Sequence, residues 1–353
     1  MIRLRVGSVS ADAIVVGAGI CGASAAYFLA ERGLDVLVLD RAGISRGTTG
    51  RGEGNVLVCD KRPGALRDLA QKGRELWESL GQRFPAARVT RKGAFVLDHP
   101  DGSDLGDLEP ALTPGMRALH EPGDLQVDPV GMTRALLSDI DVRAGVEVTG
   151  VAGGAVTLST GERLGCEHVI VATGPWAQSL TGLPVEPRKG QLVALAAPPG
   201  MIVHKLIENA YIDSVEDLDQ RLSIATVIEQ TLDGDEILVG SSRERVGFDD
   251  TVNPDLSRAM IDRAAAFVPA LRDLPARRAW CGWRAWLPDR LPAVGALVPG
   301  VWASAGHEGS GVCLGPISGL LLAQLIGGEP LVADPTPFDP RRFQAAARQT
   351  GPC

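Results

Sequence analysis

Three glycines near the start of the chain have the spacing of a nucleotide-binding turn. Gly17, Gly19 and Gly22 follow an apolar run at residues 13–16 and open a second apolar segment. Glycine at these places permits a tight turn, close approach of the backbone to a pyrophosphate, and close packing of a helix on a strand. A helix beginning there offers N–H groups and a partial positive charge to phosphates. These residues predict a dinucleotide site.

An acidic residue closes the same unit. A second apolar run, Val36–Leu39, ends at Asp40, eighteen residues after Gly22. A carboxylate at the end of the second strand can accept hydrogen bonds from a ribose diol. A lone G-x-G-x-x-G is weak, but strand, turn, helix, strand and acid in order favour a nucleotide site over an empty glycine-rich turn.

A second glycine-rich loop lies near the C-terminus. The loop 306–311 reads Gly-His-Glu-Gly-Ser-Gly and stands between an expected strand at 301–305 and an expected helix at 316–326. Three glycines in six residues let the backbone run close to a flat ligand. The helix, expected to start near Gly315-Pro316, would stabilise negative charge on a reduced flavin if the ligand is one. An ordinary glycine-rich connection is the alternative.

One arginine stands among tryptophans. Arg284 lies within the stretch 280–295, which holds three tryptophans and is otherwise largely apolar. An unpaired guanidinium is costly to bury, and a carboxylate, such as that of a substrate, would satisfy it. An internal pair with Asp289 or another acid, or stacking on a tryptophan, remains the alternative.

Two histidines and a tyrosine are further candidates. His307, in the second glycine loop, could act as a base or as a donor to a flavin. For His204 a structural role is favoured. The hydroxyl of Tyr211 could close over a substrate carboxylate, and packing in the core is an equal alternative.

Composition limits the class of protein. The 353 residues suffice for about two domains, and 45% are hydrophobic. A net charge of −8 argues against a nucleic acid or an anionic membrane as partner. Six scattered cysteines, without a Cys/His cluster, support no metal site and suggest a reducing, cytoplasmic location. We expect no export signal and no membrane span.

The segments around these motifs show two patterns, an alternation of strands and helices and a segment made mainly of strands. Strands at 12–16 and 36–40 with the helix 17–32 form one βαβ unit, and residues 186–278 are rich in strand patterns. The expected fold is α/β: a Rossmann-like, doubly wound parallel sheet with an interleaved, mainly antiparallel β-sheet domain. Residues 1–85, 128–185 and 281–353 are assigned to the cofactor-binding domain, and residues 86–127 and 186–280 to the substrate-binding domain.

The chain resembles the D-amino-acid-oxidase superfamily of FAD-dependent amine and amino-acid oxidoreductases over about residues 12–330. That superfamily includes glycine oxidase, sarcosine oxidase, hydroxyproline dehydrogenase and hydrogen cyanide synthase subunits. Four separated motifs carry the resemblance: Gly17-x-Gly19-x-x-Gly22 with Asp40-Arg41; residues 169–177; residues 188–191; and Arg284, Asp289, Pro292 and Gly295 followed by Gly306-His307 and Gly311.

The resemblance implies a role for each matching residue. Asp40 and Arg41 should lie at the adenosine ribose, Val148 at the adenine, and the loop from His307 at the isoalloxazine. The implied catalytic residues are Arg284, which would hold a substrate carboxylate, His307 and Tyr211. The implied cofactor-binding residues are Gly17, Gly19, Ile20, Cys21, Gly22, Asp40, Arg41, Thr48, Thr49, Glu53, Gly54, Asn55, Val148, Thr173, Gly174, Trp176, Gly306, His307, Glu308, Gly309, Ser310, Gly311 and Val312.

The resemblance also implies the reaction. The C–N bond of an amino acid, imino acid or secondary amine would be oxidised by hydride transfer to flavin N5, and the imine would hydrolyse. Oxygen or a partner redox subunit would accept the electrons. FAD should be non-covalent, because Gly282 occupies the place where sarcosine-oxidase-like members carry the attaching cysteine. Glu308-Gly309 departs from glycine-oxidase-like members, which carry bulkier aromatic and basic residues there.

Two alternatives predict different behaviour. A nicotinamide-linked Rossmann enzyme would be colourless and would bind NAD. A catalytically idle, FAD-carrying subunit of a heteromeric dehydrogenase would be yellow but would turn over no substrate alone.

Overall fold

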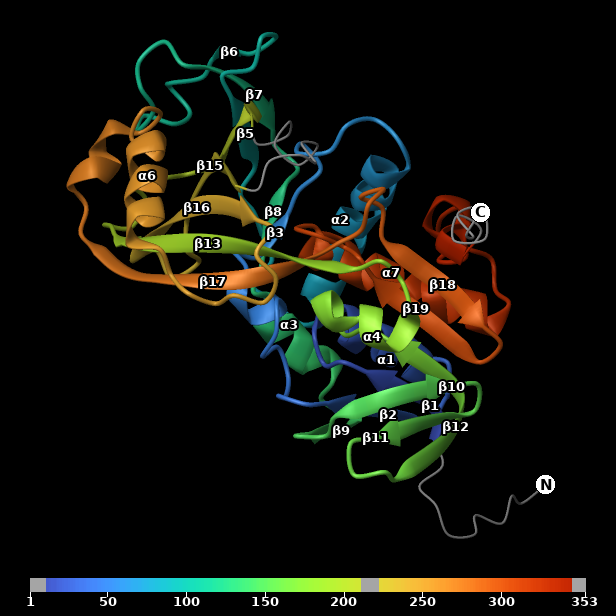
Figure 1. The fold of residues 1–353 in the computed structure, drawn as a ribbon. Helices are drawn as coiled ribbons and strands as arrows, with labels where there is room; N and C mark the ends of the chain where they lie inside the picture. Colours follow the sequence, from blue (N-terminus) through green and yellow to red (C-terminus); the bar gives the residue numbers. More distant parts are fainter. Residues whose placement is uncertain (1–10, 211–221, 345–353) are drawn as a thin grey trace, which may run out of the picture. The chain divides into compact units, whose positions relative to one another are not determined.

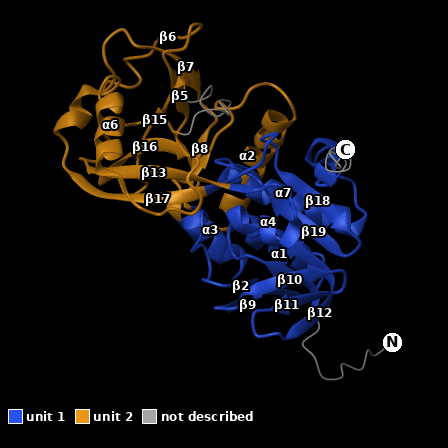
Figure 2. Ribbon diagram, in the orientation of Figure 1, with its two compact units in different colours: residues 1–50, 129–186, 284–353 blue, residues 51–128, 187–283 orange. Residues whose placement is uncertain are grey.

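The computed structural model describes residues 11–210 and 222–344, which group into two units (Figures 1 and 2). The first unit comprises residues 1–50, 129–186 and 284–353, and the second comprises residues 51–128 and 187–283. Each unit is therefore assembled from segments that are distant in the sequence.

A largely parallel sheet forms the centre of the first unit. Within the described residues it has eight strands, in the order β10-β11-β12-β1-β2-β9, with β19 also on β12 and β18 on β19. β1 lies between β2 and β12 and is parallel to both. The strands are β1 Ala11–Val16, β2 Val36–Asp40, β9 Asp141–Ala144, β10 Val148–Ala152, β11 Ala155–Leu158, β12 Arg163–Val171, β18 Ala293–Val298 and β19 Val301–Ala305.

Two apolar helices pack together in this unit, and their central positions are small. The helices of the unit are α1 Ile20–Ala30, α3 Pro129–Leu136, α4 Gln178–Thr181 and α7 Gly311–Gly327. A Cβ added at Gly319 of α7 would lie 2.6 Å from the carbonyl carbon of Ser24 on α1. Because backbone then meets backbone, the glycine sets the separation of the two helices.

The second unit is built on a mainly antiparallel sheet. Its order in the described chain is β17-β13-β16-β15-β14-β5-β7-β6, and a small sheet β3-β8-β4 stands beside it. Only β14 and β5 pair in parallel among its registered pairs. The strands are β3 Asn55–Val56, β4 Thr90–Arg91, β5 Ala94–Leu97, β6 Ser103–Asp104, β7 Arg117–Glu121, β8 Leu125–Gln126, β13 Glu186–Ala196, β14 Lys205–Glu208, β15 Leu222–Gln230, β16 Glu236–Glu244 and β17 Ala276–Trp286. The helices among the described residues of this unit are α2 Ala65–Arg83 and α6 Pro254–Ala264.

The predicted fold class is confirmed, with local differences. Helix α7 begins at Gly311 rather than near Gly315-Pro316, so Pro316 lies inside the helix. The stretch around Arg284 is part of a long strand, β17, whose last three residues belong to the first unit. Residues 51–85, assigned from the sequence to the cofactor-binding segments, group with the second unit in this division.

Replacing Gly319 by alanine should destabilise the protein. Alanine favours a helix over glycine by about 1 kcal/mol, but its Cβ would force α1 and α7 apart, a strain that typically costs about 1–3 kcal/mol. We expect a lower midpoint of urea unfolding. Gly150→Ala is the control, because its Cβ would only meet Thr157 at an ordinary 3.6 Å. A higher midpoint for Gly319→Ala would contradict the packing described.

Candidate cofactor and substrate sites

The first glycine turn is held by close backbone contacts. Gly17 has φ +113°, and a Cβ there would lie 2.4 Å from the carbonyl oxygen of Ala172, just after β12. A Cβ on Gly22 would lie 1.9 Å from the oxygen of Gly17. No other residue fits either place, so the turn after β1 is fixed as a narrow loop that leads directly into α1.

The start of α1 has the features of a phosphate cradle. Gly19 caps the helix without a side-chain hydrogen bond, and the first turn carries no acidic residue. The amide of Ile20 donates to Oγ1 of Thr49 at 3.1 Å, which places a predicted residue of the 44–58 loop at the turn. Both the helix dipole and the free amides of a first turn favour an anion here.

The Asp40 carboxylate accepts more hydrogen bonds from the protein itself than the sequence predicts. Its Oδ2 accepts from the amide of Ala18 at 2.8 Å, and its Oδ1 accepts from the amides of Ala42 and Gly43 at 2.7 Å each. A carboxylate offers about four acceptor sites. The three amides therefore leave room for about one further hydrogen bond, and Asp40 also organises the loop that follows β2.

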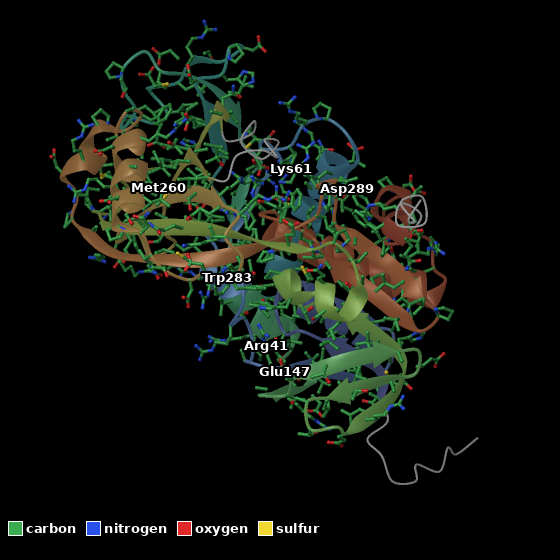
Figure 3. The ribbon with its side chains drawn as sticks, in the orientation of Figure 1. Arg41, Lys61, Glu147, Met260, Trp283 and Asp289 are labelled. Atoms are coloured by element: carbon green, nitrogen blue, oxygen red, sulfur yellow. The ribbon has the colours of Figure 1, made fainter. Side chains whose placement is uncertain are left out.

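Arg41 and Trp176 are neighbours in the first unit. The Arg41 guanidinium carbon lies 4.3 Å from the centre of the Trp176 ring, and a Cβ on Gly47 would touch that ring at 3.4 Å. Arg41 is labelled in Figure 3. Val148 starts β10 two residues after Val146, whose amide donates to the Asp40 carbonyl. The residues predicted for the adenosine end thus gather around the end of β2.

Three buried hydroxyl groups in this unit have no hydrogen-bond partner in the described chain. They belong to Thr173, which follows β12, to Ser45 and to Ser304 on β19. The amide of Ser45 donates to the carbonyl of Ala18 in the glycine turn, so its hydroxyl stands at the same loop. A buried unsatisfied hydroxyl calls for a ligand or water. Thr173 was predicted as a cofactor residue, whereas Ser45 was missed, since a serine in a glycine-rich loop carries no distinctive signal.

The side chain of His307 points into the packing of the first unit. Its Nδ1 lies 3.7 Å from Sγ of Cys21 on α1, and its Nε2 lies 3.0 Å from Oγ of Ser318 on α7. Burial lowers the pKa of His307 to about 4 and raises the pKa of the Cys21 thiol to about 12. Both groups are therefore neutral at pH 7. The ring links α1, α7 and the second glycine loop, and Ser318 is a partner that the sequence did not reveal.

Arg284 meets a different acid from the one considered in the sequence. Its Nε lies 4.0 Å from Oε1 of Glu308. Asp289 instead pairs with Arg342, with Oδ2 and Nε 2.6 Å apart. The amide of Glu308 donates to the carbonyl of Ala285 at 2.8 Å, which ties the end of β17 to the second glycine loop. The predicted carboxylate clamp and the predicted flavin loop are thus brought together in one unit.

Glu53 and Asn55 belong to a buried charged cluster of the second unit. Glu53 pairs with Lys205, and its Oε2 accepts from Nδ2 of Asn55 at 2.6 Å. Lys205 also lies 3.3 Å from Glu229, whose pKa is raised by burial although Lys205 opposes that rise. Lys205 and Glu229 were not singled out from the sequence, because a lysine and a glutamate in strands have the same pattern as a solvated face.

The remaining predicted residues divide between the two units. Thr48 lies near Gly174, where a Cβ would stand 4.0 Å from its Oγ1. Gly306 has φ +75° and allows close contact with Leu287. Residues 309 and 310 form the turn into α7, and residues 311 and 312 begin that helix. Gly54 accepts from the amide of Val127 in the second unit. Tyr211 lies outside the described residues.

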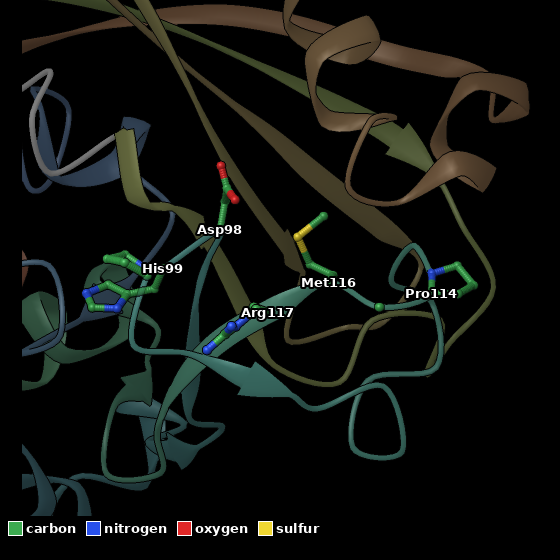
Figure 4. A pocket seen from close by; sticks show the side chains of 7 residues that line it. Asp98, His99, Pro114, Met116 and Arg117 are labelled. Carbon is green, nitrogen blue, oxygen red and sulfur yellow. The ribbon is translucent and has the colours of Figure 1, made fainter.

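Other possible sites carry none of the predicted residues. A pocket at the β5 and β7 end of the second unit (Figure 4) is lined by Asp98, His99, Pro100, Pro114, Gly115, Met116 and Arg117. Its arginine already donates twice to the carbonyl of Gly102. Among residues 11–210 and 222–344, no cluster of three His, Cys, Asp or Glu side chains is placed to hold a metal ion. None of the described helices is long and apolar enough to cross a membrane.

Comparison with known proteins decides the family. The family model of FAD dependent oxidoreductases matches residues 12–325. The chain belongs to this family. The residues present fit FAD. The unit that carries the fingerprint holds a glycine turn that no Cβ could enter, a helix start whose cap residue Gly19 has no side chain, and the unpartnered buried hydroxyls of Thr173 and Ser45.

The chain is similar to curated oxidoreductases along nearly their whole length. It is 27% identical to a glycine oxidase of Pseudomonas putida, over 94% of this chain and 98% of the relative. It is 28% identical to the hydrogen cyanide synthase subunit HcnC of Pseudomonas aeruginosa, over 94% of this chain and 96% of the relative.

Solved structures share the fold. The structure of glycine oxidase from Geobacillus kaustophilus has a TM-score of 0.82 at 23% identity, covering 94% of this chain and 98% of that one. L-proline dehydrogenase from P. horikoshii has a TM-score of 0.85 at 22% identity, covering 96% and 98%. The arrangement of elements in this FAD-dependent oxidoreductase is therefore that of known members.

Replacing His307 by glutamine should reduce the sensitivity of this oxidoreductase to acid. In the unfolded chain this histidine titrates near 6.5, but in the folded protein near 4. As the pH falls from 6.5 to 4, only the unfolded chain gains this proton, so up to about 3 kcal/mol of stability is lost. In His307→Gln that contribution disappears. Urea unfolding at pH 7.5 and pH 4.5 measures the difference.

The control is His99→Gln, which removes a histidine from the pocket loop of the second unit and keeps the contribution of His307. Parallel pH dependence in the wild type and His307→Gln would show that the ring is not held neutral by burial.

Proposed function

We propose that the chain oxidises the C–N bond of an amino acid, imino acid or secondary amine, using non-covalently bound FAD as its resident oxidant. The observation that carries the proposal is the link between Arg284 and the second glycine loop. The side chain of Arg284 is 15% exposed, and the backbone bridge from Ala285 to Glu308 fixes it beside the loop predicted to line the flavin. The names of the relatives, glycine oxidase and hydrogen cyanide synthase subunit, support a small amine substrate.

The first unit would hold the cofactor, and the second would contribute to substrate binding. Bound FAD supplies an acceptor at N5 for the hydride from the substrate carbon, after which the imine hydrolyses in water. The glycine turn and the start of α1 bind the pyrophosphate. Asp40 accepts one bond from the ribose, and Thr173 and Ser45 donate from their buried hydroxyls. In this proposal, phosphate recognition lies at the start of α1 and substrate recognition at the end of β17.

Arg284 would orient the substrate, and His307 would act as a positioning residue. A guanidinium binds a carboxylate through two parallel hydrogen bonds, which fixes the carbon whose hydrogen is transferred. The neutral ring of His307 keeps Cys21, Ser318 and the loop in place. The catalytic role first predicted for this histidine thereby becomes a structural one in our proposal. The role predicted for Tyr211 stays a proposal on the resemblance alone.

The flavin would stay non-covalent. Cys281 is the nearest cysteine in sequence to the place where related sarcosine oxidases attach flavin, and its thiol packs against Gln191 and Thr251. Burial raises its pKa, which opposes formation of the nucleophilic thiolate.

Replacing Arg284 by alanine should abolish selection of amino acids but leave FAD bound. Loss of one partner from a buried charged contact costs about 2–5 kcal/mol, so kcat/KM for the best amino acid should fall by at least about thirtyfold. Anaerobic bleaching of the flavin and steady-state rates measure this. The matched control is Arg341→Ala, an exposed arginine that pairs with Asp339. An unchanged kcat/KM in Arg284→Ala would remove the carboxylate clamp from the proposal.

A yellow protein that no amine bleaches would instead indicate the idle-subunit alternative. A protein that substrate bleaches but oxygen reoxidises slowly would be a dehydrogenase that passes electrons to a partner. A colourless protein that binds NAD would contradict the proposal.

Replacing Thr173 by valine should weaken FAD binding. One neutral hydrogen bond contributes about 0.5–1.5 kcal/mol, so the dissociation constant should rise by about threefold to tenfold. The apoprotein should be no less stable, because a buried orphaned hydroxyl is replaced by a methyl group of similar shape. Flavin fluorescence during titration of apoprotein measures the affinity, and Thr160→Val, at an exposed turn, is the control. Equal affinity in both variants would contradict this contact.

A further inference from the structure

Lys189, on β13, is a buried lysine that holds an exposed loop. The residue is 2% exposed, and its Nζ lies 2.7 Å from Oδ2 of Asp249 and 2.7 Å from the carbonyl oxygen of Thr251. Residues 245–250 are exposed and form neither helix nor strand. Burying an ammonium group costs solvation free energy that an apolar side chain would not lose. The lysine is therefore explained by the loop that it binds.

The charge of Lys189 is compensated where it is buried. Burial opposes that charge, but Asp249 and, at 3.8 Å, Glu244 stabilise the ammonium, so the pKa of Lys189 is raised. The hydrogen bond from Lys189 in turn holds the pKa of Asp249 well below its usual range. Both groups are therefore charged at pH 7, and the loop is joined to β13 by a full ion pair.

Gln191 holds the same loop where the loop enters α6. Its side chain is fully buried; Nε2 donates to the carbonyl of Asn253 and Oε1 accepts from the amide of Asn253, both at 2.9 Å. Asn253 is the N-cap residue of α6. Two of the four residues in the motif 188–191 therefore bind one loop, a role that the sequence did not reveal.

The loop also contacts Trp283 on β17. The indole Nε1 donates to the carbonyl of Asp249 at 3.2 Å, and the ring of Phe248 lies edge-on to the indole with 5.8 Å between the centroids. The guanidinium carbon of Arg51 lies 4.9 Å from the centre of the indole. Trp283, labelled in Figure 3, is 8% exposed. The indole is thus fixed by contacts that include Asp249, the residue to which Lys189 binds.

Trp283 directly precedes Arg284 on the same strand. Successive side chains of a strand point to opposite faces, so an indole that cannot rotate fixes the roll of the strand and the direction of the next side chain. On the other side of Arg284, the carbonyl of Ala285 accepts from the amide of Glu308. Arg284 therefore stands between two anchored residues of β17.

We infer that Lys189 is a positioning residue for Arg284. By pairing with Asp249 it fixes the loop 245–253 against Trp283. Trp283 then sets the direction in which the Arg284 guanidinium meets a carboxylate. The inference rests on the proposed function, because it concerns the arginine that would orient the substrate. It gives Lys189 no contact with substrate or cofactor, so its loss should weaken carboxylate binding and leave FAD bound.

The test removes the ammonium and measures both ends of this connection. Lys189→Met keeps an unbranched side chain, and the Asp249 carboxylate that it leaves behind is 40% exposed, so water can solvate it. In the FAD-loaded protein, amide hydrogen exchange over residues 245–253 should become at least about tenfold faster.

The other end is measured by ligand binding and turnover. The affinities for acetate, propionate and cyclopentanecarboxylate, measured from the change in the flavin spectrum, should fall by about fivefold to tenfold in Lys189→Met. KM for the best amino acid should rise by the same factor, with kcat changed by less than about twofold, because a carboxylate contact acts equally in the bound substrate and in the transition state.

Two further variants frame this result. Trp283→Phe keeps an aromatic ring but removes the donor to Asp249, and it should give the same pattern more weakly; it carries the test if Lys189→Met fails to load FAD. Asp235→Asn is the matched control, because it removes a carboxylate that pairs at 2.8 Å with Arg277, at the other end of β17. It should change neither exchange nor affinity. Flavin content and the unfolding midpoint show whether each variant is folded.

A double-mutant cycle decides whether the effect passes through Arg284. In Arg284→Ala the carboxylate affinity is already reduced, so adding Lys189→Met should lower it by less than about twofold more. A full additional loss would overturn the inference, and so would faster exchange of the loop with unchanged affinity. If Arg284→Ala alone leaves carboxylate affinity and kcat/KM unchanged, the proposed clamp itself is wrong and the inference falls with it.

Discussion

The structure of the first unit depends on how closely helix α1 approaches its surroundings. At one end, Gly22 packs on the backbone of Gly17, which in turn packs on Ala172. Along its side, Gly319 of α7 packs on the backbone of Ser24. At each contact, backbone atoms of a neighbouring segment occupy the place that a side chain would otherwise fill. The helix therefore cannot shift by an ångström without collision. A rigid α1 fixes the direction of its first N–H groups.

The same packing connects the two ends of the expected cofactor. Cys21 is the second residue of α1, and Ser318 stands next to Gly319 on α7; His307 is held between them. The second glycine loop is therefore positioned by the helix that also presents the first glycine turn. A neutral histidine suits this task, since a buried charge without a partner would oppose the packing that surrounds it. The loop in turn carries Glu308 to Arg284 through the bridge to Ala285.

The sequence predicted those parts whose residues interact locally. The unit from β1 to β2 has its apolar runs, glycines and acid in one stretch of thirty residues, and β19 was placed at Val301–Ala305 as observed. Helix α7 was placed too late because Pro316 has the pattern of a first-turn proline, whereas apolar packing on α1 extends the helix a turn and more before it. The long strand β17 was missed, since alternating tryptophans and arginines do not distinguish a strand from a loop.

The partners of the charged residues could not be predicted, because each pairing joins segments that only the fold brings together. Arg284 meets Glu308 rather than Asp289, and Glu53 meets Lys205, 152 positions away. The pair of Glu53 with Lys205 shows a limit of assigning roles from a family motif. The motif assigns Glu53 to the cofactor, yet in the second unit its carboxylate balances the charge of Lys205, which is 2% exposed. Removing one partner of such a pair leaves a buried charge, so loss of stability is expected at Glu53 whatever the cofactor does.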